Sequence, residues 1–96
     1  MDTLEVVRLL KEHKPSLTAR FGVERLALFG STARGTAAPA SDVDVLVAFD
    51  GPATSARYFG VQFYLEDLLG LRVDLVTDKA LRERLRPFVE RDAIAI

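Results

Sequence analysis

Three short apolar runs constrain the fold of this chain more than any other feature. Residues 25–29 read RLALF, residues 43–49 read VDVLVAF and residues 71–77 read LRVDLVT. Runs of this length that are rich in valine and leucine, and that are bounded by turn residues, are typical of short strands in a buried sheet. The sequence therefore predicts a sheet of about three strands.

Helical patterns separate these runs. Apolar residues recur three or four positions apart over residues 3–13 and 55–69, and shorter helices are predicted at 31–35 and 79–86. We expect the first helix to end before Pro15, since proline removes a helical hydrogen bond. The alternation of helices and strands predicts an α/β (α+β) fold, in which helices pack against a small mixed β-sheet.

Composition narrows the class of protein. The 96 residues suit one domain spanning 1–96, whose tail at 88–96 is compatible with either a helix or a strand. Because the net charge is only −1, no direct nucleic-acid binding is expected. No apolar run approaches the ~20 residues of a membrane helix, and cysteine is absent. We therefore expect a cytoplasmic protein without membrane contact.

Two aspartates share one face of the second strand. Asp42 and Asp44 are two positions apart, so their side chains point to the same side. At a separation of ~5 Å and an effective dielectric of ~20, their charges repel by ~3 kcal/mol. Taken alone, such a pair is most often a turn or solubility feature. A bound cation is the alternative that explains why this repulsion is tolerated.

Asp74 in the third strand supplies another carboxylate. We expect the first strand to run antiparallel to the second and the third strand to run parallel to it, because Gly30, Asp42, Asp44 and Asp74 then lie at the same end of the sheet. Carboxylate oxygens without histidine or cysteine nearby favour Mg²⁺ or Mn²⁺ over zinc. Three acidic groups on adjacent strands suit two-metal phosphoryl chemistry.

Gly30 and Ser31 directly follow the first strand. Glycine allows a ligand to approach the backbone closely, and a serine hydroxyl beside the free N–H groups of a helix start attracts phosphate. The same serine would also serve as an ordinary helix cap. Arg34 is suited either to a phosphate or to bracing an acidic neighbour, and the sequence leaves both roles open.

The combined motif resembles a known signature. Gly30-Ser31, ten residues and Asp42-Val43-Asp44 match the G-S-x10-D-x-D pattern of the DNA polymerase β-like nucleotidyltransferase superfamily. The segments GSTARG and SDVDVLV are most similar to its minimal nucleotidyltransferase (MNT) branch. The resemblance implies that Gly30 and Ser31 hold phosphate. It also implies that Asp42, Asp44 and Asp74 are catalytic and bind two Mg²⁺ ions, for which Mn²⁺ can substitute.

The resemblance also implies a reaction and a partner. Members of the MNT branch are often antitoxins encoded beside a HEPN-domain RNase toxin, and some transfer AMP from ATP to a tyrosine of that toxin. A hetero-oligomer is then expected, with an interface formed by apolar residues of 55–69 and 88–96. Two alternatives remain, namely an antitoxin that acts by binding alone and a nucleotidyltransferase for a small molecule.

Overall fold

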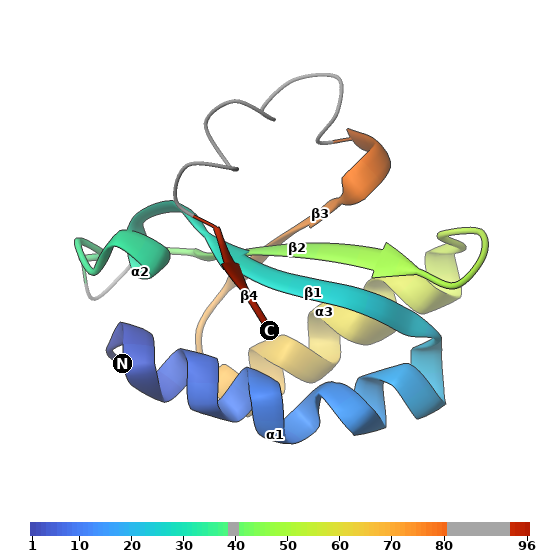
Figure 1. Ribbon diagram of the computed structural model, residues 1–96, viewed down its shortest axis with the longest axis horizontal. Coiled ribbons are helices and arrows are strands. Elements are labelled where there is room, and N and C mark those ends of the chain that lie inside the picture. The colour runs from blue at the N-terminus through green and yellow to red at the C-terminus, as the bar shows by residue number, and fades with distance from the viewer. Residues whose placement is uncertain (39–40, 81–92) are drawn as a thin grey trace.

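The computed structural model describes residues 1–38, 41–80 and 93–96 (Figure 1). Its elements are, in chain order, α1 (Thr3–Phe21), β1 (Val23–Phe29), α2 (Gly30–Arg34), β2 (Val43–Phe49), α3 (Ser55–Leu69), β3 (Val73–Thr77) and β4 (Ile94–Ala95). The predicted elements are present with small shifts at their ends, apart from α1, which is longer than predicted, and the helix expected at 79–86, which lies largely outside the described residues. None of the described helices is long and apolar enough to cross a membrane.

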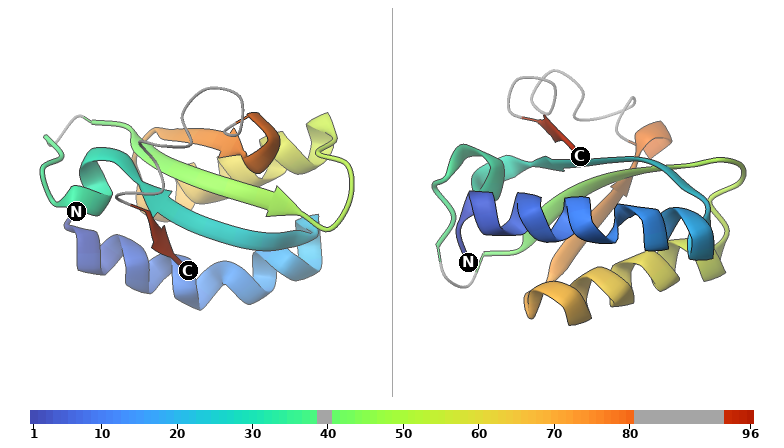
Figure 2. Two further views of the ribbon diagram at one scale, coloured as in Figure 1. Left: turned by 45° about the horizontal axis from the view of Figure 1, so that its top comes forward. Right: turned by 60° about the horizontal axis from the view of Figure 1, so that its bottom comes forward.

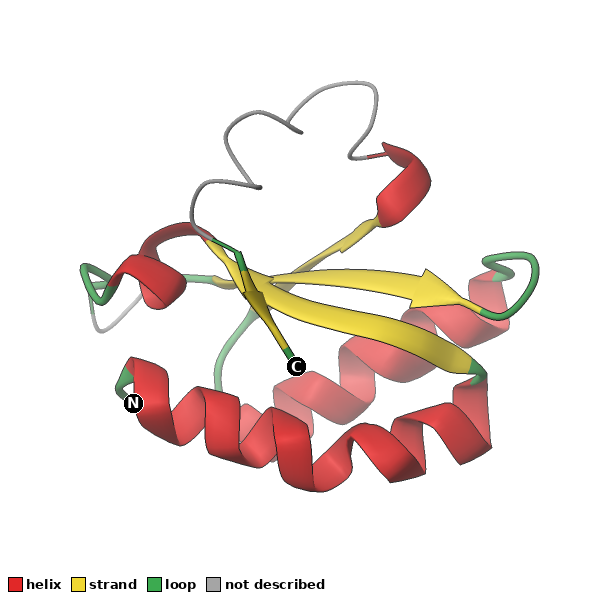
Figure 3. Cartoon of the chain, in the orientation of Figure 1, coloured by secondary structure: helices red, strands yellow, loops and turns green. Residues whose placement is uncertain are grey.

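The strands form a mixed sheet in the order β3-β2-β1-β4 (Figure 3). β1 runs antiparallel to β2, and β2 runs parallel to β3 across the connection through α3, which confirms the predicted strand directions. β4 adds a fourth strand that pairs antiparallel with β1. The end of the tail is therefore a strand, a question that the sequence had left open.

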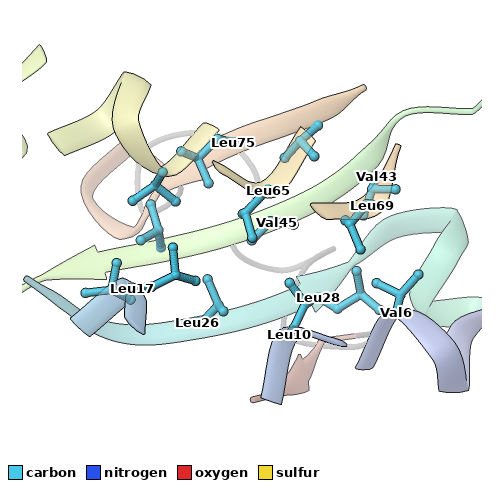
Figure 4. Close-up of a cluster of buried hydrophobic side chains, with 14 residues drawn as sticks. Val6, Leu10, Leu17, Leu26, Leu28, Val43, Val45, Leu65, Leu69 and Leu75 are labelled. Atoms are coloured by element: carbon cyan, nitrogen blue, oxygen red, sulfur yellow. The ribbon is translucent and has the colours of Figure 1, made fainter. Parts of the chain in front are cut away.

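The hydrophobic core lies between the sheet and the two long helices. α1 and α3 cover the same face of the sheet (Figure 2). Alternate residues of β2, Val43, Val45 and Val47, are fully or almost fully buried against this layer, where Leu10 of α1 and Leu65 of α3 meet them (Figure 4). Because strand side chains alternate, the residues between these valines point to the opposite face of the sheet.

The prediction that the first helix ends before Pro15 is wrong. α1 continues through Pro15 to Phe21, and Gly22 ends it with a φ of 72°. Proline removes one backbone N–H from the helix. Leu17, in the following turn, is completely buried in the core. The free energy gained by burying this later turn outweighs the cost of the hydrogen bond that the proline removes. This burial cannot be predicted from the local sequence pattern.

Candidate active site

Three aspartates gather on the sheet face opposite the helices. Asp44 on β2 is the register partner of Asp74 on β3, and Asp42 directly precedes β2. Asp42 and Asp74 are exposed and Asp44 is half-buried. The parallel pairing of β2 and β3 therefore places these residues at the same end of the two strands, as the predicted strand directions required.

Burial, together with neighbouring negative charge, raises the pKa of Asp44. Burial is the largest influence that raises the pKa of Asp44 to about 6; the charge of Asp74, a hydrogen bond with Asp74 and the charge of Asp42 add to it. Arg34 acts in the opposite direction. Asp44 is thus poorly compensated by protein cations, which is the condition under which a divalent cation binds favourably.

Gly30 connects the two halves of the sequence motif. Its neighbour Phe29 is the register partner of Asp44, and Gly30 itself has a φ of 72°, a backbone conformation that favours glycine. A Cβ at this position would overlap Oδ2 of Asp44. The glycine therefore allows the Asp44 carboxyl group to lie directly against the backbone where β1 passes into α2.

The short helix α2 contains the other two predicted phosphate ligands. Its N-cap is Phe29, which makes no side-chain cap hydrogen bond, so Ser31 lies within the helix. The alternative role of Ser31 as the helix cap is therefore wrong. Arg34 lies in the last turn, and its charge lowers the pKa of Asp44, which agrees with a role beside an acidic neighbour. Phosphate binding by Ser31 and Arg34 stays a prediction.

The donor set has the chemistry of a Mg²⁺ or Mn²⁺ site, because all its candidate ligands are carboxylate oxygens. Asp44 and Asp74 are register partners, and the absence of a side chain at Gly30 leaves room for the Asp44 carboxyl group. Nevertheless, within the described part of the chain, no three acidic, histidine or cysteine side chains converge closely enough to hold a metal ion. Asp42 instead pairs with Arg72, whose Nε lies 3.3 Å from Oδ1.

Sequence reasoning missed Arg72. The segments Asp42-Val43-Asp44 and Arg72-Val73-Asp74 run side by side, because Val43 pairs with Val73. The amide of Val43 donates to the carbonyl oxygen of Arg72 at 2.9 Å, which fixes this register. Arg72 stands two positions before Asp74, so the alternation of strand side chains was the signal that it shares the same face.

Comparison with known proteins places this arrangement in a family. A family model for the nucleotidyltransferase domain matches residues 10–96. The chain belongs to this family. The nucleotidyltransferase domain is 40% identical to the protein adenylyltransferase MntA of Thermococcus cleftensis over 92 residues, which are 96% of this chain and 93% of MntA.

Solved structures agree with this assignment. A minimal nucleotidyltransferase structure is 45% identical and superposes with a TM-score of 0.81, covering 100% of this chain and 97% of its own. This match confirms the predicted polymerase β-like fold. A more distant match, with a TM-score of 0.60 at 19% identity, comes from a complex of the tri-AMPylated Shewanella oneidensis HEPN toxin with an MNT antitoxin. It covers 97% of this chain and 66% of that chain.

Proposed function

We propose that this protein is a protein adenylyltransferase and the antitoxin of a toxin–antitoxin pair. It would transfer AMP from ATP to a hydroxyl group, expected to be that of a tyrosine, on a HEPN-type toxin. The observation that supports this function best is the nearly full-length identity of 40% to an MntA adenylyltransferase. The carboxylates Asp44 and Asp74 beside Gly30 supply the chemistry that such a reaction needs. A HEPN toxin as the AMP acceptor agrees with the complex that shares this fold.

Each site residue has a role that follows from its position. Gly30 admits the triphosphate close to the backbone, and the hydroxyl of Ser31 donates to its oxygens. Divalent ions bound to Asp42, Asp44 and Asp74 would neutralise charge on the triphosphate and lower the pKa of the acceptor hydroxyl.

The reaction itself is an in-line displacement at phosphorus. The acceptor oxygen forms a bond to the α-phosphorus, the bond to the bridging oxygen of the β-phosphate breaks, and pyrophosphate leaves. The acceptor proton passes to an exposed carboxylate of the site, for which Asp74 on the outer strand β3 is best placed. Most of the rate enhancement then comes from positioning and from charge compensation.

The acceptor side of the site is expected along β3 and α3. β3 is an edge strand, and Gln62 and Glu66 of α3 bond to the backbone of Val73 at 3.5 and 3.1 Å. Phe59 and Phe63 on α3 are 50% and 61% exposed, and their rings stack with centroids 6.2 Å apart. Two exposed, stacked rings on α3, the helix whose side chains bond to the backbone of β3, would suit contact with a protein partner.

The test uses the HEPN-type toxin that this proposal expects to be encoded beside this protein. Incubation of that toxin with this protein, ATP and Mg²⁺ is expected to add one or more AMP units to its intact mass. The double variant Asp42→Asn plus Asp44→Asn should leave the toxin mass unchanged. Transfer at the wild-type rate by this variant would refute the role of the carboxylates. If the inactive variant still formed the complex and protected cells, the protein would act by binding alone.

A further inference from the structure

Arg72 and the three aspartates form a two-by-two arrangement on neighbouring strands. The parallel register of β2 and β3 places Asp44 opposite Asp74, and two residues earlier Asp42 forms an ion pair with Arg72. One cross-strand pair therefore joins like charges and the other joins opposite charges. The Arg72 and Asp42 side chains are 84% and 46% exposed. Arg72 is thus an accessible cation on the same face as the proposed metal ligands.

The ion pair with Arg72 occupies Asp42, the third carboxylate that a metal site with three aspartate ligands would need. Nε of Arg72 contacts Oδ1 of Asp42, an oxygen that a divalent cation would also need. An exposed ion pair of this kind is weak, so a divalent cation can displace it. The guanidinium group keeps its charge after displacement. It therefore requires another anion, and a triphosphate held at the same site provides one.

We propose that Arg72 changes partner when the nucleotide binds. It holds Asp42 until a divalent cation takes that carboxylate, and it then binds phosphate oxygens of the nucleotide, for which its five N–H donors are suited. The first step rests on the metal site of the proposed function and the second on its nucleotide site, but neither step requires AMP transfer. The exchange couples the affinity for metal to the affinity for nucleotide. A metal ion alone displaces Arg72 and leaves its guanidinium group without an anion, whereas metal and triphosphate together leave Arg72 paired with phosphate.

The test measures two affinities of the variant Arg72→Gln, which removes the charge from an exposed side chain. Without nucleotide, the affinity for Mn²⁺, measured by paramagnetic resonance of the free ion, should rise about two- to fivefold because the competing cation is gone. At saturating Mn²⁺, the affinity for a non-hydrolysable ATP analogue, measured by calorimetry, should fall about tenfold. A purely structural role would not move the two affinities in opposite directions.

The matched control is Arg8→Gln. Arg8 forms an exposed ion pair with Glu12 at 3.0 Å on α1, on the other side of the sheet, so neither affinity should change. A direct measurement follows the side-chain Nε–H resonance of Arg72 in the wild-type protein. It should shift as Mg²⁺ alone is added, in step with the backbone amide of Asp44, while the Arg8 resonance stays in place.

Three results would overturn the inference. An Mn²⁺ affinity that does not change in Arg72→Gln, or an Arg72 resonance that does not move with Mg²⁺, contradicts the first step. An unchanged affinity for the ATP analogue contradicts the second step. Because none of these measurements requires AMP transfer, their failure is distinguishable from failure of the proposed enzymatic function, which the toxin mass alone reports.

Discussion

Asp44 and Asp74 lie directly opposite each other on the parallel neighbouring strands β2 and β3. Like charges in this position oppose each other whenever both groups are ionised. The arrangement therefore reduces the stability of the chain near neutral pH, and it prepares the site for a cation. The predictions below depend on this relationship and on the contacts around it.

The first prediction concerns stability and pH. The pKa of Asp44 in the folded chain, about 6, lies above its ordinary value of 3.8, so the folded chain holds an extra proton between these values. The contribution of Asp44 to the free energy of unfolding is fully present below about pH 4 and is lost as the pH rises through about 6. We expect Asp44→Asn to flatten this decline in urea unfolding experiments. An identical pH slope in the variant and the wild type would contradict the prediction.

The second prediction concerns metal binding and pH. A proton on Asp44 competes with a divalent cation for the same oxygens, so Mg²⁺ should stabilise the protein well above pH 6 and much less below it. Thermal unfolding with and without Mg²⁺, recorded on either side of this pKa, checks the expectation. Asp44→Asn should lose the stabilisation at both pH values. An Mg²⁺ effect that is equal at both pH values in the wild type would count against Asp44 as a ligand.

The third prediction compares two glycines. Gly30 and Gly70 both have left-handed backbones, with φ of 72° and 65°, so the backbone strain of alanine should cost about 1 kcal/mol of stability at either position, and the clash with Asp44 adds to this cost at position 30. For a chain of this size that corresponds to a fall in Tm of about 4–8 °C. A Cβ at position 30 would meet the Asp44 carboxyl group, whereas one at position 70 would meet nothing within 4 Å. Only Gly30→Ala should therefore abolish AMP transfer.

One result of comparing Gly30→Ala with Gly70→Ala would contradict the third prediction. If Gly70→Ala lost AMP transfer as completely as Gly30→Ala, the loss would reflect general destabilisation. The contact between Gly30 and the carboxylate would then have no special role. Folding of both variants is checked by circular dichroism at the assay temperature, so that the activities are compared between folded proteins.

The fourth prediction concerns the partner surface on α3. Phe59→Ser plus Phe63→Ser should weaken the complex with the toxin by about tenfold or more, because exposed aromatic residues contribute strongly to protein interfaces. Binding of the ATP analogue should be unchanged, since neither ring belongs to the nucleotide site. Leu4→Ser is the control, because Leu4 is 81% exposed on α1. Light scattering and calorimetry measure the complexes, and wild-type affinity in the double variant would exclude this surface.

Local patterns in the chain were sufficient for most elements and for the acidic face of the sheet. β2 and α3 have the predicted boundaries, and Gly70 follows α3 in the left-handed conformation. These features depend on neighbours within a few residues, through strand alternation, helical spacing and the conformational freedom of glycine. The spacing of Gly30-Ser31 and Asp42-Val43-Asp44 was equally local, and it was enough to indicate the family.

Features that depend on contacts between distant segments could be recognised only from the tertiary structure. α1 continues past Pro15 because Leu17 is buried against the sheet, and the end of the tail is a strand because β1 has a free edge to pair with. The raised pKa of Asp44 and the ion pair between Asp42 and Arg72 both arise from the register of β2 with β3. Register, burial and charge interaction depend on segments that folding brings together in space. A short stretch of sequence therefore does not determine them.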